Sequence, residues 1–457
     1  MTESADVIVV GMGVGGELLA ERIADAGLDV VGIEAHLVGG ECPYWGCVPT
    51  KMMTRAANAL AEARRVPYLA GTATVEPDWA PVAARIRNEA TDTWDDRVAV
   101  ERFEGKGGRF VRGSARLDGP RRVRVGERTF EARRGVVLAT GTQPAVPPLP
   151  GLQTVDYWTN HEAVEAKDAP ASLVVLGGGA VGLELAQVFS RFGSHVTVVE
   201  MMDRLLPPEE PESGELVAAV LAAEGIDVRT GVGASSVARA PDGVTVDLAD
   251  GTQLTAERLL VATGRRTDLR PLGVATLGLD ENARSIPVDD HLRAADGLWA
   301  IGDVTGLGPF THIAVYQARI AAADILGEHL TPADYRALPR VTFTDPEVGA
   351  VGPTEAQARE RGVDVRIGLA QVPTTTRGWI HKVGNEGFFK LVEDARRGVL
   401  VGATSVGPHG GEVLGLLALA VHAEVPVAQL RSMIYAYPTF HRGMEDALAD
   451  LAEPTAN

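Results

Sequence analysis

The chain has 457 residues, enough for several domains of ordinary size. Its 43 basic and 61 acidic residues give a net charge of −18, which argues against nucleic acid and anionic membrane surfaces as partners. Two cysteines in the whole chain argue against a disulfide-stapled secreted scaffold and a structural zinc site, and no apolar run reaches the roughly 18 residues of a membrane helix. With no signal-peptide pattern at the N-terminus, we expect a cytoplasmic protein.

A strand, a glycine-rich turn and a helix open the chain, and the same order returns later. The strand at 6–10 leads to a helix at 17–26, and the strand at 173–176 leads to a helix at 183–192. In each copy, a second strand ends in an acid 23 residues after the first glycine. The glycines are Gly11, Gly13 and Gly16, then Gly177, Gly179 and Gly182, and the acids are Glu34 and Glu200. Two such copies are typical of dinucleotide-binding units, in which the turn approaches a pyrophosphate and the acid binds a ribose hydroxyl.

Further strands close the two units. Apolar runs at 136–141 and 259–264 both end in Ala-Thr-Gly, and a third at 298–303 ends in Gly-Asp before a helix predicted at 311–326. After Pro339 the pattern changes to strands near 341–344, 387–392 and 399–404, with helices at 353–361, 410–423 and 426–434. This mixture without a glycine turn indicates an α+β domain.

The two cysteines, Cys42 and Cys47, lie inside the first unit. In a regular helix, residues five apart have Cα atoms roughly 8–9 Å apart, beyond the about 7 Å limit for a disulfide. A bridge between them therefore needs a distorted turn, which Pro43, Gly46 and Pro49 can provide. A disulfide closing so small a loop stabilises little, so we interpret the pair as redox-active. A helix starting near Val48 would lower the pKa of the Cys47 thiol.

Together these motifs resemble those of the pyridine nucleotide-disulfide oxidoreductases, which include lipoamide dehydrogenase, glutathione reductase and mercuric reductase. The resemblance implies an α/β homodimer with two Rossmann-like dinucleotide-binding domains, for FAD and NAD(P), and a C-terminal α+β dimerisation domain. The implied boundaries are 1–150 with 268–338 for FAD, 151–267 for NAD(P) and 339–457 for the interface.

The resemblance also implies roles for single residues. It places Cys47 next to the flavin and lets Cys42 exchange with substrate, with Lys51 near the flavin and Glu184 paired to that lysine. The implied cofactor-binding residues are the six glycines and two acids of the turns, with Thr140, Gly141, Gly264, Gly302 and Asp303. No metal site is predicted.

Coenzyme choice follows from one acid. The carboxylate of Glu200 accepts a hydrogen bond from the 2′-hydroxyl of NAD and repels the 2′-phosphate of NADP, so NADH is favoured over NADPH. Arg204 lies near enough in sequence to weaken that preference.

The chain departs from the family near its C-terminus. Members acting on dithiols carry His-Pro-Thr with a Glu five residues after the His, whereas this chain has Tyr437 and Arg442 at those positions. A phenol with a pKa near 10 is a poor base at neutral pH. If a helix follows Pro438, His441 would share a face with Tyr437, and Glu445 would orient His441. A surface or dimer contact for His441 and Glu445 is the alternative.

The sequence therefore predicts an enzyme that passes hydride from NAD(P)H to FAD, to a Cys42–Cys47 disulfide, and on to a small-molecule disulfide or other acceptor. Two alternatives stay open. One is a diaphorase or quinone reductase that uses the flavin directly, and the other is a non-catalytic flavoprotein subunit. Neither nucleic acid nor a membrane is expected as a partner.

Overall fold

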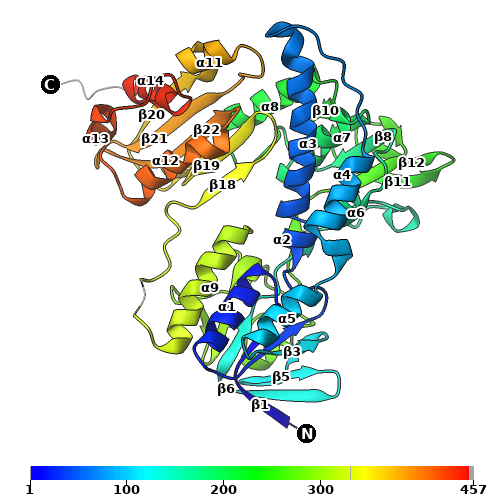
Figure 1. The fold of residues 1–457 in the computed structure, drawn as a ribbon, viewed down its shortest axis with the longest axis vertical. Helices are drawn as coiled ribbons and strands as arrows, with labels where there is room; N and C mark the ends of the chain where they lie inside the picture. Colours follow the sequence, from blue (N-terminus) through cyan, green and yellow to red (C-terminus); the bar gives the residue numbers. More distant parts are fainter. Residues whose placement is uncertain (1, 330, 452–457) are drawn as a thin grey trace. The chain divides into compact units, whose positions relative to one another are not determined.

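The computed structural model describes residues 2–329 and 331–451, which form two compact units. The first unit contains the residues up to 49 with 84–145 and 264–334. The second contains 50–83, 146–263 and the residues from 335 onward. Each unit is therefore assembled from segments that lie far apart in the sequence, as the colours of Figure 1 show.

A mixed sheet forms the first unit: some of its strands pair in parallel through crossover connections, and others are consecutive strands that pair antiparallel. Its strand order is β16-β17-β6-β1-β2-β3, with β5 on β6 and β4 on β5. The strands are β1 (Thr2–Val10), β2 (Val30–Glu34), β3 (Arg109–Arg112), β4 (Ala115–Leu117), β5 (Arg122–Val125), β6 (Arg128–Leu138), β16 (Arg293–Ala295) and β17 (Leu298–Ala300). A separate pair consists of β7 (Gln143–Pro144) and β15 (Arg265–Arg266).

The side chains of β1 alternate between two buried layers, as the period of a strand requires. Val7 and Val9 pack with residues of two helices that lie side by side in Figure 1, and Ile8 and Val10 pack on the opposite layer. Those helices are α1 (Val14–Asp25) and α9 (Thr311–Leu326). The unit also contains α2 (Glu41–Tyr44) and α5 (Arg97–Gly105), while α3 (Cys47–Arg65) and α4 (Ala80–Arg85) cross the boundaries between units.

The second unit contains three sheets. A parallel sheet has the order β10-β9-β8-β14, an antiparallel meander has the order β11-β12-β13, and a five-stranded antiparallel sheet has the order β18-β19-β22-β21-β20. The first two contain β8 (Ser172–Leu176), β9 (His195–Val199), β10 (Asp227–Arg229), β11 (Ala234–Ala240), β12 (Gly243–Leu248), β13 (Gln253–Ala256) and β14 (Arg258–Val261). The third contains β18 (Pro339–Thr342), β19 (Glu347–Val351), β20 (Val365–Gln371), β21 (Phe388–Asp394) and β22 (Val399–Gly407).

Helices of this unit cover its sheets. They are α6 (Asn160–Glu165), α7 (Ala180–Arg191), α8 (Pro211–Ala223), α10 (Glu355–Glu360), α11 (Thr376–His381), α12 (Gly410–His422), α13 (Val427–Ser432) and α14 (Met444–Asp450). The apolar side of α12 packs on β19 and β22 and forms one core with α13 and α14. Within the described residues, no helix is both long and apolar enough to span a bilayer.

The predicted fold class is confirmed, and the helix predicted at 311–326 coincides with α9. The helices after the glycine turns begin three residues earlier than predicted, at Val14 and Ala180, because the second glycine of each turn already caps the helix. The boundaries of the three expected domains stay a prediction.

Candidate functional site

The two glycine turns have the same geometry. The first glycine of each has a positive φ, +92° at Gly11 and +113° at Gly177, and a methyl group there would overlap the carbonyl oxygen of the closing Ala-Thr-Gly strand. A methyl group on the third glycine, Gly16 or Gly182, would overlap the carbonyl oxygen of the first. The fold itself therefore requires the first and third glycines.

The second glycine of each turn is different. Gly13 and Gly179 have φ values of −66° and −88°, which any residue adopts, and a methyl group would meet only one atom at 4.0 Å at Gly13 and none within 4 Å at Gly179. Each caps a helix of 12 residues and offers no side chain to its free N–H groups. Neither the backbone conformation nor the packing requires glycine at these positions. A pyrophosphate at the helix N-terminus would require it, because a side chain would keep the pyrophosphate away from the backbone.

The two acids also match in their contacts. Glu34 accepts hydrogen bonds from the backbone N–H of Met12 at 2.7 Å and of His36 at 2.8 Å. Glu200 accepts them from the N–H of Gly178 at 2.6 Å and of Met202 at 2.8 Å. In both turns the carboxylate thus accepts one hydrogen bond from the N–H of the residue after the first glycine. It accepts another from the N–H of the residue two positions after the acid. This fixes the carboxylate beside the turn, where a ribose hydroxyl would lie.

Arg204, which was expected to weaken the effect of Glu200, has its guanidinium bound elsewhere. It donates to the backbone carbonyl oxygens of Pro207 at 2.7 Å and of Glu209 at 2.9 Å. These contacts hold the Arg204 guanidinium in its own loop, while the Glu200 carboxylate accepts its hydrogen bonds from backbone N–H groups.

A polar chain that the sequence analysis missed connects the closing strands of the first unit. The hydroxyl of Thr142 donates to the Asp303 carboxylate at 2.7 Å, and Arg265 donates from Nε to Thr142 Oγ1 at 2.7 Å. Burial raises the pKa of Asp303, which Thr142 and Arg265 partly oppose. A further hydrogen bond, for example from a ligand hydroxyl, would stabilise the charged form of this partly desolvated carboxylate. Their position in the sequence could have identified these two residues, since Thr142 and Arg265 each directly follow an Ala-Thr-Gly.

The remaining expected cofactor residues lie at the ends of these strands. Gly141 and Gly264 have φ of +64° and +113°, with open space where a side chain would be. Thr140 precedes Gly141 and is half-buried. Gly302 has φ of +76°, and its N–H donates to the Gln317 side chain at 2.6 Å.

The cysteine pair lies where the chain leaves one short helix and enters a long one. Cys42 lies in α2, and Cys47 is the first residue of α3. The N–H groups of Trp45 and Gly46 both donate to the carbonyl oxygen of Glu41, which folds the chain back between the cysteines. The predicted distorted turn is therefore present. Cys42 is half-buried and Cys47 is exposed.

The two thiols interact with each other. The pKa of the Cys42 thiol is raised well above its usual value, mainly by its hydrogen bond to Cys47 and next by burial. This shift favours the protonated form of Cys42. Cys47 lies at the positive end of the α3 dipole, a position that favours a thiolate.

Lys51 and Glu184 form the expected ion pair. Lys51 Nζ lies 2.5 Å from Glu184 Oε2, and the other oxygen of Glu184 accepts from the N–H of Phe343 at 2.8 Å. Glu184 is buried, and the ammonium group of Lys51 lies 4.7 Å from the centre of the Phe343 ring. The contacts hold the lysine in one orientation.

The expected shifted acid–base pair rests on a helix directly after Pro438, but the helix begins later in the chain. A 3₁₀ turn begins only at His441 and α14 begins at Met444, so Tyr437 shares no helical face with His441. Glu445 pairs with Arg442 at 2.9 Å instead of orienting His441, because its position in α14 brings it next to the i−3 residue. His441 Nε2 lies 3.4 Å from the Thr439 hydroxyl. Tyr437 is 65% exposed, and the Arg442 guanidinium lies over its ring.

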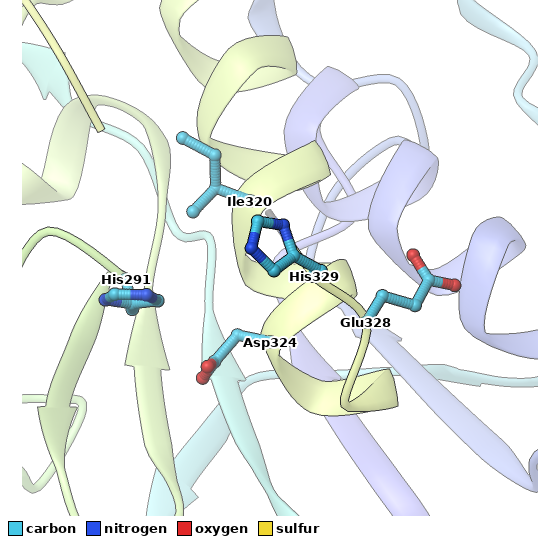
Figure 2. Close-up of a pocket in the computed structure, with 5 residues that line it drawn as sticks. All are labelled: His291, Ile320, Asp324, Glu328 and His329. Carbon is cyan, nitrogen blue, oxygen red and sulfur yellow. The ribbon is translucent and has the colours of Figure 1, made fainter. Parts of the chain in front are cut away.

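A hollow lies at the C-terminal end of α9. It has a volume of about 290 Å³ and is lined by Ile320, Asp324, Glu328, His291 and His329. Figure 2 shows Glu328 pointing away from His291, and Glu328 pairs with Arg22. His291 and the neighbouring Asp289 and Asp290 bring three possible metal ligands within 4.8 Å of one another, a cluster the sequence analysis did not predict.

Known proteins similar to the chain agree with this geometry. Residues 5–318 match a family model described as pyridine nucleotide-disulphide oxidoreductase. Residues 338–448 match its dimerisation domain. A mercuric reductase of Acidithiobacillus ferrooxidans is 34% identical over 96% of this chain and 81% of its own length. A dihydrolipoyl dehydrogenase of Thermus scotoductus is 34% identical over 97% of this chain and 96% of its own length.

A solved structure gives the same result. The Cu(II) complex of the HOCl-induced flavoprotein disulfide reductase RclA from Escherichia coli superimposes with a TM-score of 0.86 at 27% identity, covering 98% of this chain and 99% of that one.

Proposed function

We propose a role for each site residue of this chain, which belongs to the pyridine nucleotide-disulphide oxidoreductases. The chain is an FAD-dependent, NAD(P)H-linked disulfide oxidoreductase, and its dimerisation domain makes it a homodimer. Bound FAD supplies the transfer of two electrons from NAD(P)H to a disulfide.

The residues of the first glycine turn fit FAD. Gly13 has open space in front of the N-terminus of α1, which suits a pyrophosphate, and Glu34 is held by two N–H groups beside the turn, which suits a ribose. Gly11 and Gly16 shape the turn itself. We assign Asp303 to a further hydroxyl of the cofactor, with Thr142 and Arg265 fixing its carboxylate. Thr140, Gly141, Gly264 and Gly302 would border the site.

The second turn fits the nicotinamide coenzyme for the same reasons, with Gly179 before α7 and Glu200 beside it. We propose that NADH is preferred over NADPH. The charge of Glu200 opposes a 2′-phosphate, and Arg204 is bound to its own loop.

We propose the following division between the cysteines. Cys47 holds the negative charge of the reduced pair, and Cys42 keeps the proton and exchanges with the acceptor. Lys51, oriented by Glu184, would contribute a positive charge next to the flavin.

We propose that residues 1–150 with 268–338 bind FAD, 151–267 bind the coenzyme, and 339–457 form the dimer contacts. The match of 338–448 to a dimerisation domain supports the last assignment. In the assembled dimer, Tyr437 or His441 would supply the proton for the leaving thiol of a small disulfide substrate. The test is the pH profile of disulfide reduction by Tyr437→Phe and His441→Gln, and two unchanged profiles would remove both residues from the mechanism.

The observation that carries the proposal is the pair of interacting thiols, Cys42 and Cys47, in the unit that also contains the first glycine turn. The experiment is to screen disulfides, quinones and metal ions with NADH, using wild type and Cys42→Ser. Loss of disulfide turnover with quinone turnover unchanged supports the proposal. Equal turnover of every acceptor by both proteins would instead identify a diaphorase.

A further inference from the structure

Helix α7 presents three buried polar side chains on one face. Glu184, Gln187 and Arg191 follow one another at spacings of three and four residues, so they share that face, and each is at most 5% exposed. Buried charges and amides require partners, because an unpaired one loses its hydration without compensation. All three side chains of α7 find partners in one short segment of the same unit, residues 343–345, which connects β18 to β19.

Asp345, the last residue of this segment, is bound through its backbone and through its side chain. Gln187 donates to the Asp345 carbonyl oxygen at 2.9 Å and accepts from the Asp345 N–H at 2.8 Å. The Asp345 carboxylate accepts from Arg191 and from Arg65 of α3, each at 2.8 Å. Arg191 is itself fixed by two bonds to Glu224, at 2.6 and 3.0 Å. Charge-assisted bonds of this kind are the strong ones, so they hold Asp345 firmly in place.

Two residues before Asp345, the same segment contacts the Lys51–Glu184 ion pair. The backbone N–H of Phe343 donates to one oxygen of Glu184 at 2.8 Å, while Lys51 binds the other oxygen. The Phe343 ring also lies 4.7 Å from the Lys51 ammonium group. If Phe343 moved, one oxygen of the buried Glu184 would lose its donor and the ammonium group would lose its ring contact. The orientation of Lys51 therefore depends on Phe343, and the position of Phe343 depends on Asp345.

We propose that Asp345 is a positioning residue for Lys51 and acts through Phe343 and Glu184. This inference rests on the proposed function, in which Lys51 contributes a positive charge next to the flavin. The charge of Asp345 is what two arginines bind, so a neutral side chain of the same shape would hold the segment more weakly. A displaced ammonium group stabilises developing negative charge less well, so a loosely held Lys51 slows reduction of the bound flavin.

The experiment uses the holoenzyme and compares Asp345→Asn, which removes the charge at nearly constant size, with Glu393→Gln as a matched control. Glu393 is also buried and pairs with an arginine, Arg366, at 2.7 Å, but it lies on β21. Stopped-flow absorbance measures the rate of flavin reduction by NADH. We expect that rate to fall about tenfold in Asp345→Asn, with little change in the apparent Kd of NADH. Glu393→Gln should leave the rate unchanged.

A second comparison shows whether Asp345 acts through Lys51. The same Asp345→Asn substitution is made in a Lys51→Met background, where no ammonium group is left to position. Because residues of one network do not act additively, we expect no further slowing in that background. An unchanged rate in Asp345→Asn alone, or equal slowing in both backgrounds, would overturn the inference. Gln187→Met removes the two bonds to the Asp345 backbone and should give the same result if Asp345→Asn does not fold, as judged by flavin content.

Chemical labelling of Lys51 gives a readout that does not depend on the flavin. The chain has only five lysines, so competitive acetylation followed by peptide mapping compares Lys51 with the other four in one sample. We expect acetylation of Lys51 to rise about threefold in Asp345→Asn, because an ammonium group that leaves its carboxylate is more accessible to the reagent. If Lys51→Met alone leaves flavin reduction unchanged, the proposed place of Lys51 next to the flavin is wrong. The labelling still tests Asp345 in that case, and equal labelling in wild type and Asp345→Asn would overturn the inference.

Discussion

Two glycines, Gly13 and Gly179, are explained by a bound ligand rather than by the fold of the chain. Their backbone angles are ordinary and the space in front of them is open, in contrast to the first and third glycines of the same turns. At the scale of single residues, they are the clearest sign that both turns approach a ligand.

We expect Gly179→Ala to fold normally and to bind FAD normally. Its KM for NADH should rise roughly tenfold or more, because a methyl group displaces the pyrophosphate from the helix N-terminus. Steady-state kinetics and flavin absorbance measure the two effects. The control is Gly105→Ala in α5, which also adds a methyl group in open space but away from a glycine turn. An unchanged KM in Gly179→Ala would mean that the coenzyme does not contact this turn.

The raised pKa of Cys42 gives a second prediction. The largest cause of this rise is the hydrogen bond to Cys47. A serine at position 47 has no thiolate form at neutral pH, so it cannot hold the Cys42 proton in the same way. In Cys47→Ser, the pKa of Cys42 should therefore fall toward the value of about 8.5 of a free thiol. At a pH between the two pKa values, the variant reacts faster than wild type with iodoacetamide, as measured by peptide mapping. A slower reaction in the variant would show that burial, rather than Cys47, holds the proton.

At the scale of elements, the loop after β9 sets coenzyme choice. Glu200 accepts hydrogen bonds from the N–H of Gly178 in the glycine turn and of Met202 in the loop, and Arg204 is bound to carbonyl oxygens within the loop. The loop therefore presents a negative charge where the 2′-position of the adenosine ribose would lie.

We expect wild type to have a higher kcat/KM with NADH than with NADPH. Glu200→Gln removes the charge with little change in shape and should lower that ratio about tenfold, mainly by admitting NADPH. Glu34→Gln is the matched variant in the first unit, and we expect it to lower flavin content while the coenzyme ratio stays constant. A ratio that favours NADPH in wild type would show that another basic group reaches the 2′-phosphate.

For the whole molecule, exposed apolar side chains mark the surface that a second copy would cover. Within the segment that matches the dimerisation domain, Trp379, Tyr437 and Ile434 are 73%, 65% and 96% exposed. Side chains of this size are costly in water and are characteristic of interfaces.

We expect Ile434→Asp to weaken the homodimer by about tenfold or more in dissociation constant, because it introduces a charge into an apolar contact. Analytical ultracentrifugation over a concentration series measures this. Val98→Asp changes a similarly exposed apolar residue outside the dimerisation segment and should leave the dimer intact. Equal effects of the two substitutions would argue against Ile434 as an interface residue.

The sequence by itself determined the features that depend on neighbouring residues. Glycine spacing predicted both turns, since only glycine adopts a positive φ without strain, as at Gly11 and Gly177. Apolar alternation predicted the strands, and the acid at a fixed offset predicted Glu34 and Glu200. The Cys-Pro-Tyr-Trp-Gly-Cys segment predicted a distorted turn between the two cysteines. These signals are local because backbone conformation is set within a few residues.

Only the tertiary structure decided which distant groups meet. Thr311 contacts Cys47 across 264 positions and Thr142 contacts Asp303 across 161, and no periodicity connects such pairs. It also corrected the C-terminal prediction, because Glu445 pairs with Arg442 as soon as α14 begins at Met444 rather than after Pro438. Long-range contacts arise from how sheets and helices pack, and packing depends on the whole core rather than on the residues that finally touch.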